Sequence, residues 1–206
     1  AHEQHGNAAT EFLSRYGVVP QMVVVAVYNV DRIRDFFPVF DETWPTSGGA
    51  GKFLDFVGGE LIPYIDGHYR TSGYNVAMGH SAGGVFITYV LLEKPELFDG
   101  YISVSPFLQY ADQQMVKEAA TKLKPGYDSA KRIYLTVGDE PDYYVPLEAF
   151  HSLVKEKSSQ SIAIEYVKLG AEDHASAPYL SLFNGLRYVL RYGIAWRAMP
   201  NDLPPW

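Results

Sequence analysis

The chain contains no cysteine, which excludes a disulfide framework, a thiolate zinc site and a cysteine nucleophile but does not identify a compartment. It also has no apolar run near the roughly 18 residues that a membrane helix needs. Basic residues are scarce, with 17 Lys and Arg against 24 Asp and Glu and a net charge of −7. An acidic chain without a basic run is poorly suited to bind nucleic acid or an anionic membrane, so we expect neither partner.

The composition that remains is globular: 206 residues, of which 47% are hydrophobic and 20% charged. This length fits one domain of ordinary size. The hydrophobic content also excludes a disordered chain or a low-complexity array.

Short β-branched runs alternate with longer helical patterns. The continuous apolar run 22–28 is typical of a strand covered on both faces. Four further strands are predicted at 75–78, 101–104, 132–137 and 162–169. The last of these carries charged residues, which favours a place near a sheet edge.

Helices are predicted at 8–16, 52–64, 82–93, 146–157 and 180–190. Pro63 should kink the end of the second helix, and Pro146 should occupy the first position of the fourth. The repeated alternation predicts an α/β fold, a mostly parallel sheet with helices on both faces. The first helix has no strand before it, so we expect the fold to be N-terminally incomplete, with at least one strand carried by a preceding segment.

The segment Gly79-His80-Ser81-Ala82-Gly83 has the pattern G-x-S-x-G between a predicted strand and a predicted helix. In that context the pattern predicts a nucleophile elbow. The tight turn should strain the backbone of Ser81, and Gly79 and Gly83 should remove side chains that would clash there. The N–H of Ala82, at the start of the helix, is the expected first oxyanion donor. The alternative is a structural glycine-rich turn. His80 is expected to pack beside Ser81 and to point away from it.

A serine hydroxyl is a weak nucleophile and needs a base. His174 lies in the loop after the last predicted strand, and such loops gather at the sheet edge where Ser81 is expected. The order serine, acid, histidine also agrees with this architecture. His2 and His5 are expected in a frayed terminus, and His68 and His151 are expected to be surface or structural residues.

The acid that orients the imidazole should follow the strand 132–137. Asp139, Glu140 and Asp142 all lie there, and the spacing does not choose among them. A solvated acidic turn is the alternative role, expected for two of the three.

Several further motifs accompany the elbow: Arg34-Asp35 with Pro38, the segment 60–65, Tyr69-Arg70-Thr71, the segment 95–100, Ser103-Val104-Ser105-Pro106 and Asp173-His174. As a set, over residues 8–180, they are similar to the Putative esterase family, which includes esterase D-like and enterobactin esterase-like α/β-hydrolases. The resemblance implies an α/β-hydrolase fold for residues 1–190.

The resemblance also implies serine-dependent hydrolysis of carboxylic esters without a metal or cofactor. Ser81 and His174 match the nucleophile and the base of the family. Its Gly-x-Glu pattern favours Glu140 as the acid over Asp139 and Asp142, although some members are described as using a Ser–His pair alone.

Two features depart from the family. Members carry an N-terminal strand in the middle of the sheet, and the loop after it gives the second oxyanion N–H. Here both would fall at or before Ala1. The tail 191–206 instead resembles the N-terminal region of insertion-sequence transposases, and we carry no DNA binding over from it. A Pro-rich tail that packs its tryptophans onto the domain is the alternative.

The leading hypothesis is a serine carboxylesterase that acts on a small-molecule ester. An acyltransferase on the same scaffold, and a catalytically impaired remnant or binding module, are the alternatives. The chain has 16 tyrosines, which could line a site for catecholate siderophores or phenolic esters, so the substrate stays open.

Overall fold

The computed structural model describes residues 2–191. Its elements in chain order are α1 (His2–Arg15), α2 (Arg32–Phe36), α3 (Ala50–Phe56), η1 (Val57–Leu61), α4 (Ile62–His68), β1 (Val76–His80), α5 (Ala82–Glu93), η2 (Pro95–Leu97), β2 (Gly100–Val104), α6 (Tyr110–Lys122), β3 (Lys131–Val137), α7 (Pro141–Ser158), β4 (Ile162–Lys168) and α8 (Ala177–Arg191).

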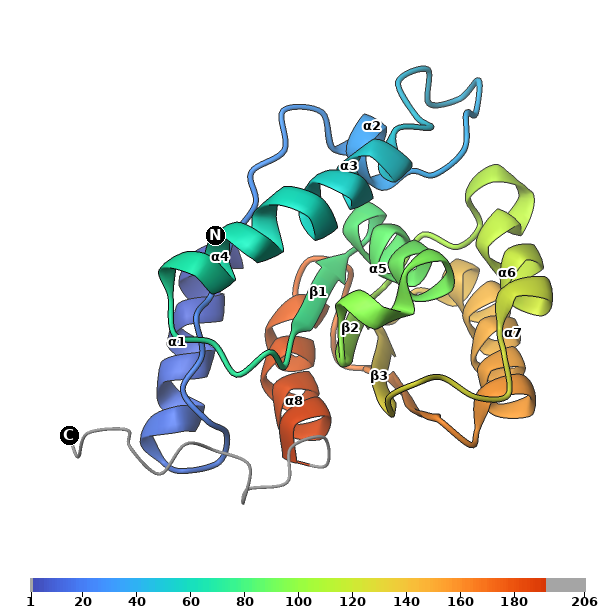
Figure 1. Cartoon of the computed structure of the whole chain (residues 1–206). Helices are drawn as coiled ribbons and strands as arrows, with labels where there is room; N and C mark the ends of the chain where they lie inside the picture. Colours follow the sequence, from blue (N-terminus) through green and yellow to red (C-terminus); the bar gives the residue numbers. More distant parts are fainter. Residues whose placement is uncertain (1, 192–206) are drawn as a thin grey trace.

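The strands of the described residues form one parallel sheet in the order β1-β2-β3-β4 (Figure 1). His80 at the end of β1 is paired with Val104, and Val104 is paired with Thr136 of β3. Thr136 is in turn paired with Val167 of β4. Because all three strand pairs are parallel, the segments that follow the four strands leave from one edge of the sheet.

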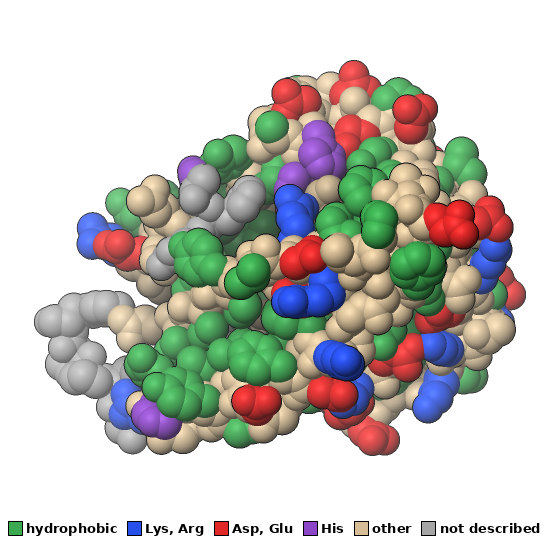
Figure 2. All heavy atoms as spheres, turned by 90° about the horizontal axis from the view of Figure 1, so that it is seen from above, with side chains coloured by type: hydrophobic (Ala, Val, Ile, Leu, Met, Phe, Trp, Pro, Cys, Tyr) green, Lys and Arg blue, Asp and Glu red, His purple; other side chains and the backbone are tan. Residues whose placement is uncertain are grey.

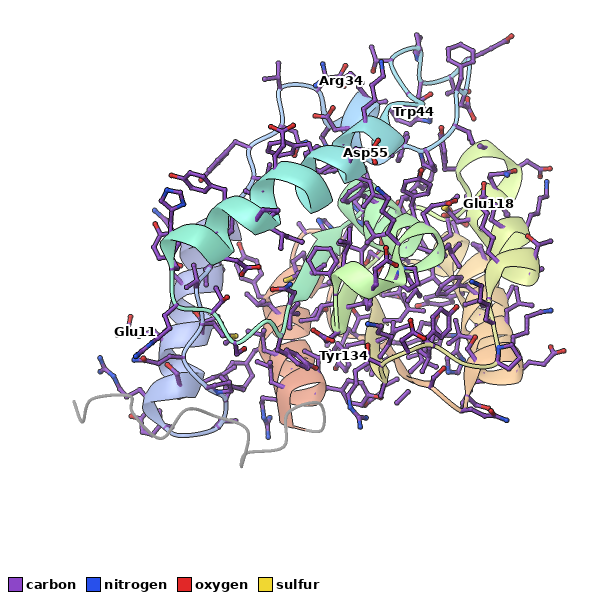
Figure 3. All side chains as sticks on the ribbon, in the orientation of Figure 1. Glu11, Arg34, Trp44, Asp55, Glu118 and Tyr134 are labelled. Atoms are coloured by element: carbon purple, nitrogen blue, oxygen red, sulfur yellow. The ribbon has the colours of Figure 1, made fainter. Side chains whose placement is uncertain are left out.

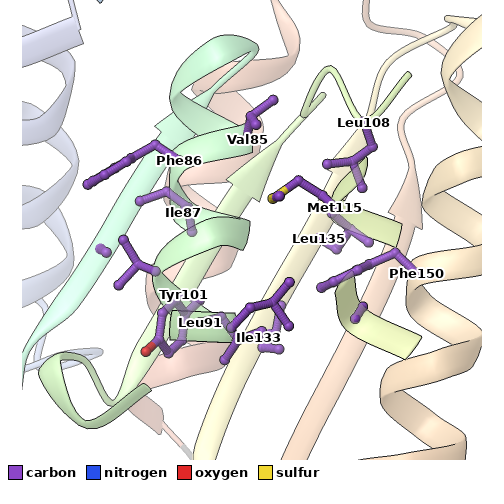
Figure 4. Close-up of a cluster of buried hydrophobic side chains, with 14 of the residues drawn as sticks. Val85, Phe86, Ile87, Leu91, Tyr101, Leu108, Met115, Ile133, Leu135 and Phe150 are labelled. Atoms are coloured by element: carbon purple, nitrogen blue, oxygen red, sulfur yellow. The ribbon is translucent and has the colours of Figure 1, made fainter. Parts of the chain in front are cut away.

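Helices cover both faces of this sheet. Buried residues of α5, α6 and α7 pack on one face, where they form the larger hydrophobic cluster (Figure 4). Residues of α1 and α8 pack on the opposite face around Ile102, Val104 and Tyr134. All five residues of β2 are buried, as expected for a strand covered on both sides. Tyr101 contributes to the first cluster and its neighbour Ile102 to the second, which is the alternation that a strand imposes.

The predicted α/β fold is confirmed, and four of the five predicted strands are present with small changes at their ends. β4 lies at an edge of the sheet, as its charged residues indicated. Within residues 2–191, two α-helices and the three-residue 3-10 helix η2 were missed. α2 is only five residues long, and α6 buries only Tyr110, Met115 and Ala119, so its sequence shows little helical periodicity.

The predicted strand 22–28 is wrong, since residues 21–29 have no regular secondary structure. Val23, Val25 and Val27 are 47%, 43% and 42% exposed. A strand depends on backbone pairing with a neighbour, and an apolar composition alone does not supply one. Within the described residues β1 pairs only with β2, so its other edge has no strand beside it.

The positions of two prolines also differ from expectation. The helix predicted to end at 64 continues past Pro63 to His68, and the irregular turn in it is the π-helical one at Val57–Leu61, which precedes the proline. The N–H of Ile62 bonds to Val57 O, five residues back, instead of to the carbonyl four residues back as in an α-helix. The backbone hydrogen bonds just before Pro63 are therefore already shifted, and the helix continues through the proline. Pro146 lies inside α7, whose first residue is Pro141.

The expected segment before Ala1 stays a prediction, and the tail 192–206 lies outside the described residues. Among the helices of residues 2–191, none combines the length and the apolar character that crossing a lipid bilayer requires.

The exposure of the apolar run gives a matched stability test. Val137→Ala removes two methyl groups from a side chain that is 0% exposed in β3, and should lower the free energy of unfolding by about 2 kcal/mol or more. Val25→Ala makes the same change at a side chain that is 43% exposed, and should cost less than about 1 kcal/mol. Urea denaturation measures both, and an equal or larger cost at Val25 would contradict this placement.

Candidate active site

Ser81 occupies the turn between β1 and α5. Its backbone has φ 58 and ψ −118, a positive φ that non-glycine residues rarely adopt. Its N–H donates to Val104 O at 2.9 Å, and its carbonyl accepts from the N–H of Phe107 at 3.5 Å. The strained conformation expected of a nucleophile elbow is therefore present, held by the end of β2.

The glycines of this turn have different roles. A Cβ on Gly79 would lie 2.2 Å from Gly83 O, so no other residue fits there. A Cβ on Gly83 would meet only the ring of Phe36 at 3.8 Å, which is ordinary contact. The expectation of a clash is thus met at Gly79 and not at Gly83. The next residue, Gly84, is the crowded one, with Pro106 at 2.9 Å from its Cβ position.

α5 begins directly after Ser81, and ten of its twelve residues are buried. Ala82 is its first residue, so its N–H has no acceptor within the helix. The positive end of the helix dipole lies at the same point. A free N–H beside Ser81 is the feature required of an oxyanion donor.

His174 and Glu140 meet through their side chains. His174 Nδ1 lies 2.5 Å from Glu140 Oε1. A carboxylate oxygen only accepts hydrogen bonds, so Nδ1 carries a proton, and in a neutral imidazole the free lone pair is on Nε2. The Glu140 side chain is 10% exposed and that of His174 is 42% exposed. The acid is thus shielded, while the imidazole remains reachable.

The carboxylate of Glu140 has further donors. Ser105, the residue after β2, donates its hydroxyl to Glu140 Oε2 at 2.5 Å. The N–H of Gly138 donates to the same oxygen at 3.1 Å. Both oxygens of Glu140 are therefore engaged, one by His174 and the other by groups that end β2 and β3.

The other two candidate acids have different contacts. Asp139 is exposed, and its Oδ1 accepts from the Tyr144 hydroxyl at 3.4 Å. Asp142 is exposed in the first turn of α7, where its backbone carbonyl accepts from Gln109 Nε2 at 2.9 Å. Of the three carboxylates, Glu140 is the one in contact with His174.

The loop that carries His174 is fixed by its neighbour. Asp173 Oδ1 accepts from the N–H groups of Ser176 and Ala175 at 2.8 and 2.9 Å. The N–H of Ser176 is the first cause that holds the pKa of Asp173 below its ordinary value. The N–H of Asp173 donates to Ser176 Oγ at 2.9 Å, which closes a compact turn before α8. These hydrogen bonds therefore hold the backbone that carries the His174 side chain.

Aromatic rings surround the imidazole. The His80 ring lies 4.4 Å from that of His174, between centroids, and the Tyr143 ring lies 5.7 Å away. Burial, and after it the charge of Glu140, raises the pKa of Tyr143. The ring that His80 meets is that of the predicted base, and the expectation that His80 points away from Ser81 stays a prediction. Since His80 precedes Ser81 in the chain, this contact brings the elbow and the base together.

The aromatic surface continues away from His174. The ring centroid of Tyr143 lies 5.9 Å from that of Phe107. The Phe107 centroid lies 6.4 Å from that of Trp44, which belongs to the connection between α2 and α3. Trp44 also packs on Phe37 at 5.8 Å. Figure 3 labels Trp44 at the end of the molecule toward which the β1 arrow of Figure 1 points. Seen from that end, charged side chains of both signs are interspersed with hydrophobic ones (Figure 2).

The other described histidines have structural contacts. His68 Nδ1 lies 2.7 Å from Tyr64 O within α4. His151 packs on Tyr166 at 5.5 Å, and burial lowers its pKa. The expectation of a frayed terminus is wrong for His5, which lies in α1 and packs edge-on against the ring of Tyr179, with 4.1 Å between centroids. The side chain of His2 lies outside what the structure describes. Among residues 2–191, no group of three or more His, Asp or Glu side chains is arranged to hold a metal ion.

Two residues of this site were not singled out as candidates from the sequence. Ser105 directly follows a strand, so the rule that loops meet at the carboxyl edge could have included it. Tyr143 lies three residues after Glu140, but only the folded start of α7 shows that its ring faces His174.

A parallel sheet with a strained serine between a strand and a buried helix defines the chain as an α/β-hydrolase. A family model described as Putative esterase matches residues 2–177. The chain belongs to this family.

Similar proteins include Ferri-bacillibactin esterase BesA from Bacillus subtilis (strain 168), which is 27% identical over 155 residues. These residues cover 71% of this chain and 54% of BesA, so the chain spans about half the length of that relative. The solved structure of an IroE-like serine hydrolase from Shewanella oneidensis matches with a TM-score of 0.79 at 23% identity, covering 91% of this chain and 66% of that chain.

The siderophore hydrolase EstB from Aspergillus nidulans matches with a TM-score of 0.76 at 20% identity, covering 93% of this chain and 79% of that chain. At such identities the two structures establish the shared fold.

The unequal crowding at the elbow gives a paired test. Gly79→Ala should destabilise the protein by more than about 3 kcal/mol, because its Cβ would overlap Gly83 O and the backbone has to move. Gly83→Ala should change the free energy of unfolding by less than about 1 kcal/mol, since space is available and alanine favours a helix. Thermal unfolding followed by circular dichroism measures both, and similar stability of the two variants would contradict this geometry.

Proposed function

We propose that the protein is a serine carboxylesterase in which Ser81 is the nucleophile, His174 the general base and Glu140 the residue that orients the base. The contact that carries this proposal is that of His174 Nδ1 with Glu140 Oε1 at 2.5 Å, which leaves Nε2 free to accept a proton. The packing of His80 on His174 supports the placement of that base beside the elbow.

The reaction begins when Ser81 Oγ attacks the ester carbonyl while His174 Nε2 takes the hydroxyl proton. The negative charge on the carbonyl oxygen faces the N–H of Ala82 and the N-terminus of α5. Glu140 stabilises the imidazolium as it forms. The intermediate collapses as His174 gives its proton to the leaving alcohol, and an acyl ester on Ser81 remains.

A water molecule completes the cycle. His174 accepts a proton from the water as its oxygen attacks the acyl carbonyl, and returns the proton to Ser81 Oγ as the acid leaves. These steps draw on side chains and backbone groups of the chain itself.

The proposed substrate class is the ester of a siderophore. Two observations favour it: the relatives named above include a ferri-bacillibactin esterase and a siderophore hydrolase, and aromatic rings extend from His174 to Trp44. Rings of this kind provide stacking surfaces for aromatic acyl groups. A catecholate ester should be hydrolysed with a higher kcat/KM than an aliphatic ester with the same alcohol, and the reverse order would remove this assignment.

The role of Ser81 is tested with a fluorophosphonate probe, which labels an activated serine. The protein should be labelled, and Ser81→Ala should abolish labelling and lower ester turnover by about 10³-fold or more. Ser72→Ala, which removes an exposed hydroxyl, is the matched control and should retain both. Folded protein that is not labelled would refute the proposed function. Product analysis with an added acceptor alcohol separates hydrolysis from acyl transfer.

The choice of acid is tested by a pair of amide substitutions. Glu140→Gln keeps the shape of the side chain but removes the charge that stabilises the imidazolium, so kcat should fall by about 10² to 10⁴-fold. Asp142→Asn makes the same chemical change two residues away on an exposed side chain, and should leave kcat near that of the parent. Steady-state kinetics with an activated ester measures both. A larger loss in Asp142→Asn would transfer the role to that residue.

A further inference from the structure

Ser105 is a buried serine for which the proposed reaction has no step. It follows β2 directly and is 0% exposed. Its φ of 39 lies in the left-handed region that favours glycine. Its N–H donates to Thr136 O at 2.8 Å, which ties the residue to β3.

The direction of the Ser105 hydroxyl follows from its partners. Its oxygen lies 2.5 Å from Glu140 Oε2, and it accepts from the N–H of Gly138 at 3.4 Å. A carboxylate oxygen only accepts, so the hydroxyl hydrogen points at Glu140. The hydroxyl and the N–H of Gly138 together hold Oε2, which leaves Oε1 facing His174 Nδ1.

The backbone conformation of Ser105 also indicates that its side chain has a role. A glycine would adopt this φ without crowding from a Cβ, but it would bring no hydroxyl to the carboxylate. Strained residues persist where the surrounding contacts over-determine them, and they cluster at functional sites. The bonds of Ser105 to Thr136 and Glu140 are such contacts.

We propose that Ser105 is a positioning residue: its hydroxyl fixes the plane of the Glu140 carboxylate so that Oε1 receives the Nδ1–H of His174. The effect on turnover rests on the proposed function, whereas the effect on the Glu140–His174 hydrogen bond does not. Without the hydroxyl, the carboxylate keeps one donor to Oε2 and can rotate about its terminal bond, so the imidazole loses its fixed orientation.

The chain offers a matched control in Ser103, two residues earlier in β2. Its hydroxyl is also buried, with the residue 3% exposed, and donates to Gly84 O at 3.2 Å. Ser103→Ala and Ser105→Ala thus remove the same group from neighbouring buried positions. The hydroxyl of Ser105 contacts Glu140, and that of Ser103 bonds to a backbone carbonyl of α5.

The kinetic test compares the two variants with an activated ester. Ser105→Ala should lower kcat by about 10- to 100-fold with little change in KM, because misorientation of a reacting group acts on the transition state. Ser103→Ala should leave kcat near that of the parent. Equal kcat in Ser105→Ala and the parent, at equal folded fraction, would overturn the proposal.

A double-mutant cycle separates positioning from a general loss of stability. In a Glu140→Gln background the charge that Ser105 positions is already gone, so adding Ser105→Ala should lower kcat by less than about twofold. The same fold loss in both backgrounds would show that Ser105 acts independently of Glu140, and would overturn the proposal.

A spectroscopic test does not require turnover. The Nδ1–H of His174, bonded to a carboxylate, should give a strongly downfield proton resonance that is absent from His174→Gln. The resonance should persist in Ser103→Ala and be lost or move upfield in Ser105→Ala. Its absence from the folded parent, or its persistence unchanged in Ser105→Ala, would overturn the proposal. If the fluorophosphonate probe fails to label the parent, the proposed function fails, while this resonance still decides the role of Ser105.

Discussion

Parallel pairing of the strands in chain order is the constraint on which the rest of this structure depends. It brings the ends of all four strands in residues 2–191 to one edge of the sheet. Each following segment then contributes a different group there: the serine of the elbow after β1, Ser105 after β2, Glu140 after β3 and His174 after β4. Their separations follow from strand spacing, so no long loop has to be ordered to bring them together.

Burial on both faces makes this arrangement rigid. Helices on either side leave every residue of β2 inaccessible, and the elbow lies between the end of β2 and the first turn of α5. A Cβ on Gly79 would overlap Gly83 O, which shows how little space remains at that point. A strained serine persists there because the packing around it permits no relaxed alternative. The same argument applies to Ser105, which is fixed between β2 and β3.

Sequence patterns predicted the features that depend on neighbouring residues in the chain. They failed for features that depend on contacts with distant parts of the chain. The elbow, the limits of α5 and the parallel sheet follow from glycine spacing and apolar periodicity. The run 22–28 is as apolar as a buried strand, but whether it pairs depends on a neighbour that composition does not reveal. Position along the chain pointed to His174. Spacing alone left Asp139, Glu140 and Asp142 open, and only the resemblance to the family favoured Glu140. The contact of Glu140 with His174 depends on how the start of α7 turns, which spacing does not reveal. The predicted preceding strand and the nature of the tail stay predictions.

The hydrogen-bond chain from Ser105 through Glu140 to His174 joins residues 35 and 34 positions apart in the sequence. Closing each of these contacts costs chain entropy, because the segment between the two residues has to be ordered. A chain that ends before β4 holds the elbow and Glu140 but not His174. Under the roles proposed above, a growing chain therefore gains its base only after β4 has been synthesised.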